Sequence, residues 1–281
     1  MSMISLFHSV SELCSEVTTK KYSTSFSSAI SLLHRDLRKP IYNIYGFVRF
    51  ADEIVDTFHE YDKARLLADF KKETFDALER KISLNPILNS FQKTVNEYNI
   101  DQSLIEAFFH SMEMDLTQKA YDANNFGEYI YGSAEVVGLM CLHVFCEGKK
   151  ELYEKLKLPA RSLGAAFQKV NFLRDIKSDY NGLSRMYFPG CDFNNFTKED
   201  KCQIEEDIYM DFKNAYAGII QLPLKARFGV YVAYKYYLSL FKKIKRMNPA
   251  RVLETRVRIP NHRKAMIILR AGLKNQMGLL G

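Results

Sequence analysis

The chain has 281 residues, 47% of them hydrophobic and 26% charged, which is ordinary for a soluble globular protein with a substantial core. Its five cysteines are odd in number and contain no C-x-x-C pair, which excludes a disulfide framework and a zinc site of that type. The first 19 residues carry no Lys or Arg, and the most apolar stretch, Val136 to Cys146, is short. We therefore expect a cytoplasmic protein with neither a signal peptide nor a transmembrane helix.

The chain is predicted to be helical almost throughout, as one all-α domain over residues 1–281. Apolar residues recur every three or four positions in many windows, such as 66–78 and 105–112. Strand-like alternation is scarce. Pro40 is expected to start a helix, and the residues 124–127 (NNFG) are expected to form a turn.

The first unusual feature is a pair of carboxylates within the helix predicted from Ile41 to Phe58. Tyr45, Arg49, Asp52 and Asp56 fall within an arc of about 60° that overlaps the apolar face of this helix. Two inward carboxylates repel each other and require a cation. Two explanations stay open here: a structural ion pair with the arginine, or a shared hard cation such as Mg²⁺.

The segment 167–180 (FQKVNFLRDIKSDY) holds a second pair with the same spacing. Gln168, Asn171, Asp175 and Asp179 fall within about 80° of one another, and all four offer oxygen atoms. Two such helices facing each other across a cavity would need cations to neutralise four carboxylates. Mg²⁺ together with an anionic diphosphate ligand is the natural combination.

The positive charge lies mostly at the end of the chain. Although the net charge is +7, the residues from Phe241 onward contain eleven Lys or Arg and one acid, Glu254. A solvated helix face is the plain explanation of this basic segment, and attraction to anionic lipid or to an anionic substrate is the functional one. No nucleic-acid-binding motif accompanies the charge, so nucleic acid is not an expected partner.

The ordered set of motifs resembles the squalene/phytoene synthase family of head-to-head prenyl synthases. Within that family, it is most similar to a bacterial phytoene synthase. The resemblance covers most of the chain. Two positions depart from the family pattern: Thr24 stands where many relatives carry Lys, and Glu135 where relatives usually have Gly. The segments that carry the resemblance are 22–26 (YSTSF), 45–56, 112–116 (MEMDL), 129–138 (YIYGSAEVVG), 168–179 and 185–189 (RMYFP).

This resemblance implies an all-α isoprenoid synthase bundle with a central active-site cavity. It also implies roles for individual residues, which we write as expectations. The metal ligands would be Asp52, Asp56, Asn171, Asp175 and Asp179. The diphosphate would be held by Ser23, Ser25, Arg49, Arg174 and Arg185, with Gln168 beside them, and the active-site tyrosines would be Tyr45, Tyr129 and Tyr236.

The activity implied is that of a prenyltransferase that joins two geranylgeranyl diphosphates into phytoene. Mg²⁺, as two or three ions, would be the cofactor, with Mn²⁺ as an alternative and without NADPH. Dehydrosqualene or squalene synthesis from farnesyl diphosphate is the rival activity. A catalytically inactive relative acting in assembly or lipid binding is the non-enzymatic one. Peripheral contact of the basic C-terminal segment with the inner face of the membrane is a further expectation.

Overall fold

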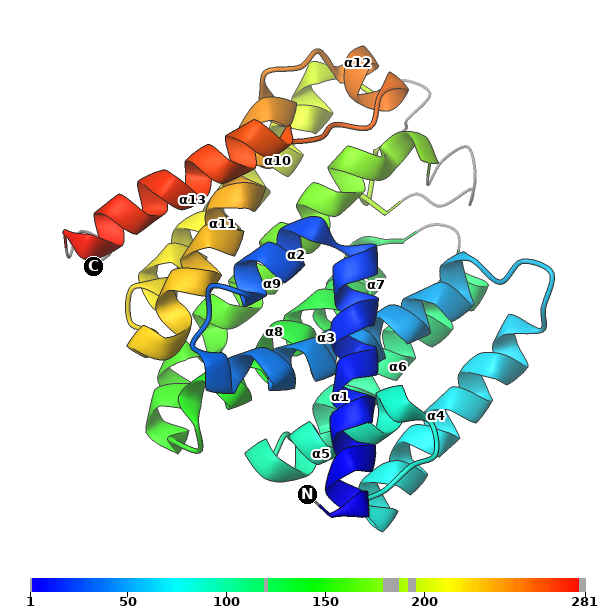
Figure 1. The fold of residues 1–281 in the computed structure, drawn as a ribbon. Helices are drawn as coiled ribbons and strands as arrows, with labels where there is room; N and C mark the ends of the chain where they lie inside the picture. Colours follow the sequence, from blue (N-terminus) through cyan, green and yellow to red (C-terminus); the bar gives the residue numbers. More distant parts are fainter. Residues whose placement is uncertain (1, 119–120, 179–186, 192–195, 278–281) are drawn as a thin grey trace.

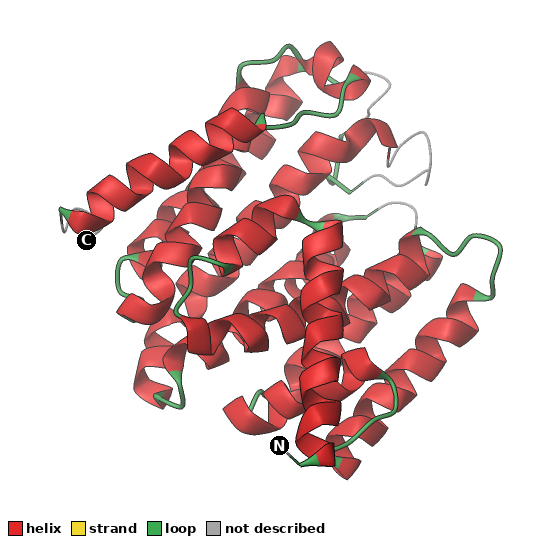
Figure 2. Cartoon of the chain, in the orientation of Figure 1, coloured by secondary structure: helices red, strands yellow, loops and turns green. Residues whose placement is uncertain are grey.

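The computed structural model describes residues 2–118, 121–178, 187–191 and 196–277. Within these ranges the regular structure is helical and no strand is formed (Figures 1 and 2). The all-α prediction is confirmed there. In chain order the helices are α1 (Met3–Tyr22), α2 (Thr24–Ile30), α3 (Arg35–Asp56), α4 (Lys63–Arg80), α5 (Pro86–Tyr98), α6 (Gln102–Thr117), α7 (Ala123–Ile130), the π-helical turn η1 (Tyr131–Glu135), α8 (Val136–Cys146), α9 (Lys150–Ser178), α10 (Lys198–Ile219), α11 (Leu224–Lys245), α12 (Pro249–Glu254) and α13 (Asn261–Gln276).

Two local predictions are wrong, and capping and packing explain both. Helix α3 begins at Arg35, so Pro40 lies inside it, where burial of its ring outweighs the lost hydrogen bond. Residues 124–127 belong to α7 instead of a turn. The Asp122 side chain accepts hydrogen bonds from the backbone N–H groups of Asn124 and Asn125, and so starts a helix at this point.

Two hydrophobic cores build the bundle. The first joins α3, α4, α5, α6 and α8, and at its centre the rings of Phe47 and Phe91 stack with centroids 3.8 Å apart. The second joins α7, α9, α10, α11 and α12 and is rich in tyrosine. Most aromatic rings therefore serve packing, as the composition suggested. The first carboxylate motif lies on a helix of the first core and the second motif on a helix of the other.

The continuous helical run α7–η1–α8 lies against α6 and α9. Its segment Asn124–Cys146 is apolar and long enough to cross a membrane on composition alone, with a mean hydropathy of 1.4. However, 56% of its 18-residue apolar window is buried inside the bundle, as in the central helix of a soluble protein. The backbone N–H of Val136 donates to the carbonyl of Tyr131, five residues earlier, which is the hydrogen bond of a π-turn.

Small residues let this central run approach its neighbours closely. A Cβ atom added to Gly164 of α9 would lie 2.5 Å from the carbonyl oxygen of Ala134, and one added to Gly132 would lie 2.4 Å from that of Ala107. Neither contact leaves room for a side chain. The two glycines thus set how tightly α9 and α6 close on the central run, which forms one wall of the cavity described below.

Ion pairs between α9 and α10 fix the rotation of α9 about its own axis. The buried Lys169 Nζ lies 2.5 Å from Asp207 Oδ2 and 2.8 Å from Asp211 Oδ2, both on α10. A buried ammonium needs such partners, because leaving it unpaired costs several kcal/mol, of order 3–5. With Lys169 held outward, its neighbours Gln168 and Asn171 line the cavity on the opposite side.

Candidate active site

A cavity of about 590 Å³ lies between the two cores. Its charged end is formed where α3 and α9 terminate, and Asp52, Asp56 and Asp175 all line it there. Toward the starts of the same helices the lining becomes apolar and includes Ile41 and Leu156. The cavity therefore suits a long apolar ligand with an anionic head, provided that cations offset the carboxylates.

The first motif holds a carboxyl group, Asp52, whose ionisation the fold disfavours. Burial is the largest cause that raises the pKa of Asp52, and the charge of Asp56 also raises it. Arg49 lowers it and Asp115 raises it, and the resulting pKa is about 7. A carboxyl group whose pKa is this high gains from any cation that binds beside it. The electrostatic conflict that the sequence predicted is therefore present in the fold.

Arg49 does not resolve that conflict. Its guanidinium forms an ion pair with Glu53, one helical turn away. The guanidinium also lies over the ring of Tyr22, 4.4 Å from the ring centroid, while its Nε is buried without a hydrogen-bond partner. The explanation of the first motif as a plain Arg–Asp pair is thus not supported, and the buried Nε–H remains available to an anionic ligand.

A group of tyrosines surrounds Asp115 behind the first motif. Tyr129 donates its hydroxyl proton to Asp115 at 2.8 Å and Tyr121 donates at 3.3 Å. Burial raises the pKa of Tyr129 well above its usual value, and the charge of Asp115 raises it further. The ring of Tyr187 stacks on Phe172 with centroids 3.9 Å apart, and both rings line the cavity. The phenol of Tyr129 therefore stays protonated and holds Asp115 in place.

The second motif already contains its own cations. Arg174 forms a bidentate pair with Asp175, with an Nη2–Oδ2 distance of 2.5 Å. Arg256, from the segment between α12 and α13, adds an Nε–Oδ1 contact of 2.9 Å to the same carboxylate. Both arginines line the cavity. Two guanidinium groups at the mouth of an apolar cavity form a natural site for diphosphate oxygens.

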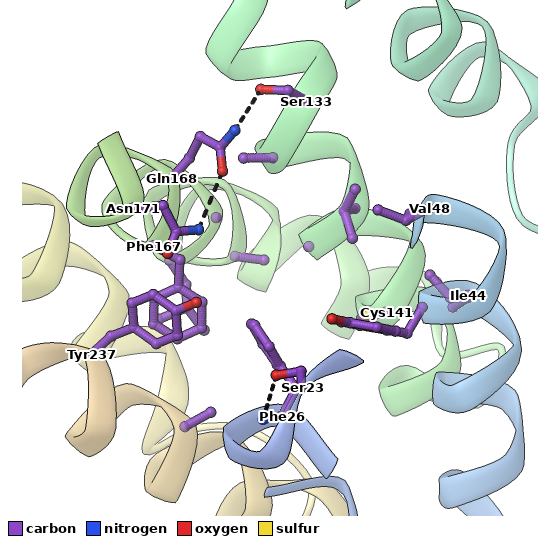
Figure 3. Close-up of a pocket in the computed structure, with 18 of the residues that line it drawn as sticks. Ser23, Phe26, Ile44, Val48, Ser133, Cys141, Phe167, Gln168, Asn171 and Tyr237 are labelled. Carbon is purple, nitrogen blue, oxygen red and sulfur yellow. Dashed lines mark hydrogen bonds between the residues drawn. The ribbon is translucent and has the colours of Figure 1, made fainter. Parts of the chain in front are cut away.

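Gln168 and Asn171 extend this polar side of the cavity (Figure 3). Gln168 donates to Ser133 Oγ at 3.5 Å, and Asn171 Nδ2 donates to Gln168 Oε1 at 3.5 Å. This arrangement leaves Asn171 Oδ1 buried without a hydrogen-bond partner. An orphaned buried amide oxygen is costly, and a hard cation would satisfy it.

These donors fit a divalent cation in their chemistry, although the described residues do not form a finished cage. Among them, no group of three or more His, Cys, Asp or Glu side chains gathers closely enough to hold an ion. Of the predicted metal ligands, those that line the cavity are Asp52, Asp56, Asn171 and Asp175. The predicted ligand Asp179 and the predicted diphosphate residue Arg185 lie outside the described residues. The Mg²⁺ site stays a prediction.

The two predicted serines have different positions. Ser23 lines the cavity, and its Oγ caps α2 by accepting the N–H of Phe26 at 3.2 Å (Figure 3). It lies near Tyr45, whose pKa burial raises to about 12 against a lowering effect of Ser23. Ser25 is not among the residues that line the cavity. The structure thus brings Ser23 and Tyr45 to the site and leaves Ser25 outside it.

Comparison with known proteins decides the family. A family model described as squalene/phytoene synthase matches residues 19–203. The chain belongs to this family. Its members join prenyl diphosphates head to head, so the chain is classed with the prenyltransferases. The family resemblance of the sequence motifs is therefore confirmed.

Several family members with known names resemble the chain. A 4,4'-diapophytoene synthase of Staphylococcus haemolyticus is 26% identical over 195 residues, which cover 68% of this chain and 67% of that protein. A presqualene diphosphate synthase of Rhodopseudomonas palustris is 29% identical over 168 residues, 59% of this chain and 58% of that protein. A phytoene synthase of Arthrospira platensis is 27% identical over 290 residues, covering 94% and 92%. The head-to-head reaction is common to these names, but the product is not.

Solved structures show the same fold. The crystal structure of a dehydrosqualene synthase with a ligand superposes with a TM-score of 0.80 at 19% identity, covering 96% of this chain and 98% of that one. The squalene synthase HpnC of Alicyclobacillus acidocaldarius gives a TM-score of 0.73 at 19% identity, covering 84% and 93%. The expected isoprenoid synthase bundle with a central cavity is therefore confirmed.

The structure places a different tyrosine of α11 in the cavity from the one that the sequence predicted. Tyr236 does not line the cavity, and its hydroxyl is buried without a hydrogen-bond partner. Its neighbour Tyr237 lines the cavity instead and stacks on Phe167 with centroids 3.9 Å apart (Figure 3). Burial raises the pKa of Tyr237, and the charge of Arg174 and the side chain of Asn171 lower it, so its hydroxyl lies near the second motif. A step of one residue turns a helix by about 100°, which explains the error.

The two departures from the family pattern each have a local partner. Lys264 of α13 donates to Thr24 Oγ1 at 3.2 Å, so an ammonium group does lie beside this position, supplied by a distant helix. Glu135 is expected to face outward. It lies away from the cavity lining and pairs with Arg161 of α9, with an Nε–Oε2 distance of 2.5 Å.

Proposed function

We propose that this chain condenses two molecules of geranylgeranyl diphosphate into phytoene. The observation that carries the proposal is one cavity that is charged at one end, by the Asp52 and Asp175 motifs with two arginines, and apolar along the rest. Along α9 the lining runs from Asp175 to Leu156, a distance of about 28 Å at 1.5 Å per residue. This length supports a long prenyl chain.

The reaction begins with loss of diphosphate from one substrate. Arg174 and Arg256 would hold the departing diphosphate oxygens through charge-assisted hydrogen bonds, and Arg49 is available at the facing helix. Mg²⁺ bound between Asp52, Asp56 and Asn171 would supply Lewis-acid neutralisation of the leaving group. Asp179 and Arg185 remain proposed contributors to the same set.

The allylic cation left behind is then attacked by the double bond of the second substrate. Loss of a proton closes a cyclopropyl ring and gives the cyclopropyl diphosphate. A second loss of diphosphate, rearrangement and loss of another proton give the hydrocarbon. The aromatic rings of Tyr45, Tyr237 and Phe167 line the cavity and would stabilise the cations through their π faces. The departing diphosphate itself would accept the protons.

The rival substrate is farnesyl diphosphate, because a relative and a solved structure carry the names diapophytoene synthase and dehydrosqualene synthase. Purified protein should be incubated with Mg²⁺ and either diphosphate, with and without NADPH, and the hydrocarbon identified by mass spectrometry. A C40 product without NADPH is the expected outcome. A C30 product would identify farnesyl diphosphate as the substrate. Absence of any C30 or C40 hydrocarbon would overturn the enzymatic proposal in favour of a non-catalytic relative.

A cytoplasmic location is part of the same proposal. All five cysteines are unpaired in the structure, which supports a reducing compartment. Fractionation of expressing cells tests the location directly, and recovery in an oxidising compartment would count against it.

A further inference from the structure

Helix α13 buries one apolar face and exposes another. It lies on the outside of the bundle beside α11 (Figure 1), and Ile267, Ile268 and Ala271 face the second core. The opposite side carries four exposed apolar side chains within an arc of about 80°, here named the α13 stripe. The stripe consists of Met266, Leu269, Leu273 and Met277, which are 45%, 65%, 52% and 61% exposed.

Unpaired positive charge borders the α13 stripe. Arg263, Arg270 and Lys274 are exposed, lie within about 60° of one edge of the stripe, and pair with no carboxylate among the described residues. The helix contains no acidic residue. On the adjacent α11, burial is the main cause that lowers the pKa of Lys235, and the charges of Lys274 and Lys242 lower it further. The region therefore holds several cations without a counter-charge of its own.

Tyrosines also lie on the neighbouring helices α11 and α10, where Tyr231 is buried at 3% exposure. The ammonium of Lys235 lies 5.7 Å from the ring centroid of Tyr231, and the ring of Tyr216 is 6.4 Å from that of Tyr231. Tyr216 and Tyr209 on α10 are 38% and 55% exposed. Tyrosine has an apolar ring and a polar tip, and it is enriched where proteins meet the headgroup region of a bilayer.

From these features we infer that the α13 stripe and its basic border form a docking surface for a bilayer that contains anionic lipids. An apolar stripe beside Lys and Arg is the pattern of a helix that lies in the membrane interface. A second copy of the chain would bring like charges together, and a nucleic acid would leave the four apolar side chains exposed to water. Anionic lipid satisfies both the charge and the apolar area.

The docking surface is tied to the charged end of the cavity, and this link rests on the proposed function. Lys264, on the inner side of α13, donates to Thr24, the neighbour of the cavity residue Ser23. Arg256, five residues before α13, lines the cavity and contacts Asp175. A docked α13 would therefore hold the prenyl diphosphate site close to the lipid phase in which the substrate's apolar chain and the hydrocarbon product dissolve.

The test is co-sedimentation of the full chain with vesicles, without substrate. Vesicles of phosphatidylcholine mixed with phosphatidylserine should bind the protein, vesicles of phosphatidylcholine alone should bind it weakly, and added salt should release it. The double variant R270Q/K274Q removes two charges and should lower partitioning by about 30-fold, which is about 1 kcal/mol per charge. L269S/L273S should also lose binding while keeping turnover in a detergent assay.

A matched control comes from α1, which exposes Leu6 and Leu13 by 47% and 56% on a face without such a basic border. The variant L6S/L13S should keep full vesicle binding. Equal binding to neutral and anionic vesicles, or equal binding by R270Q/K274Q and the original chain, would overturn the inference. So would a dimer in sedimentation that L269S/L273S dissociates, or DNA binding that outcompetes vesicles. Since no substrate is present, these outcomes are separate from failure of the proposed reaction.

Discussion

The two carboxylate motifs share one spacing but differ in electrostatic state. In α3, Arg49 pairs with Glu53, one helical turn away, while burial and the charge of Asp56 raise the pKa of Asp52 to about 7. In α9, Arg174 adjoins Asp175 and pairs with it directly, and Arg256 joins them. The two arginines therefore differ in partner, because Arg49 pairs with a glutamate beside the aspartates and Arg174 with an aspartate of its own motif.

This difference divides the work of the site. The first motif would gain from a bound cation, because the fold raises the pKa of Asp52, which lines the cavity. The second motif presents guanidinium groups toward the same cavity and is prepared for an anion. A metal–diphosphate complex bound between the motifs would satisfy both at once.

The largest effect is expected from Asp52→Asn, which removes the uncompensated charge without changing the shape of the side chain. Turnover should fall by at least about 100-fold, a typical loss when one electrostatic contact in a catalytic site is removed. Product formation at saturating Mg²⁺ measures it. Asp69→Asn, at an exposed carboxylate of α4, is the control and should retain full activity. Full activity in Asp52→Asn would remove the first motif from the mechanism.

Arg256→Ala examines the second motif. Losing one charge-assisted contact to diphosphate, worth about 1.5–3 kcal/mol, should raise KM by about 10- to 150-fold. Steady-state kinetics with varied prenyl diphosphate gives this value. Arg251→Ala, at an exposed arginine of α12, should leave KM unchanged. An unchanged KM in Arg256→Ala would mean that Arg256 only balances the charge of Asp175.

The raised pKa of Asp52 also predicts a pH dependence of stability. Without divalent cation, the fold favours the protonated carboxyl, whose pKa rises from 3.8 to about 7. The stabilisation from this group is therefore complete below pH about 4 and is lost as pH rises through about 7. The Tm difference between Asp52→Asn and the original chain should grow over this range and then level off. A constant difference would contradict the raised pKa, and Mg²⁺ should reduce the difference at pH 8.

The smallest effects concern the adjacent tyrosines of α11. Tyr237→Phe removes a hydroxyl from the cavity lining near the second motif and should reduce turnover by about 2- to 10-fold, the value of one hydrogen bond to a bound ligand. Tyr236→Phe removes a buried hydroxyl without a partner, so activity should be unchanged and stability equal or up to about 1 kcal/mol higher. The opposite order of activities would restore Tyr236 as the site residue.

Periodicity predicted the helical part of the site well, because it depends on local geometry. The positions of Asp52, Asp56, Asn171 and Asp175 on cavity-facing sides of α3 and α9 follow from 3.6 residues per turn. Arg256 could not be predicted in this way. It lies outside any helix, 81 residues after Asp175, and only tertiary packing brings the two together.

Other errors have equally definite causes. Tyr236 and Tyr237 differ by one position in a helix, and an approximate match to a motif cannot decide between faces 100° apart. The sequence motif does not reveal that Glu53 pairs with Arg49, which lines the cavity and stays a predicted diphosphate contact. A proline usually marks the start of a helix, but Pro40 is buried inside α3, which begins five residues before it at Arg35.

The π-turn Tyr131–Glu135 makes the site depend on chain length as well as on side-chain identity. A π-turn holds one residue more than an α-helical turn, so it takes up the extra residue locally and leaves α7 and α8 on nearly the faces of an uninterrupted helix. Deletion of one residue inside the turn would convert it to an α-helical turn with little rotation of α8, whereas deletion of Val137, within α8 itself, would rotate the rest of that helix by about 100°. Gly138 and Cys141 would then leave the cavity wall, so we expect a deletion inside the turn to be tolerated better than one just after it.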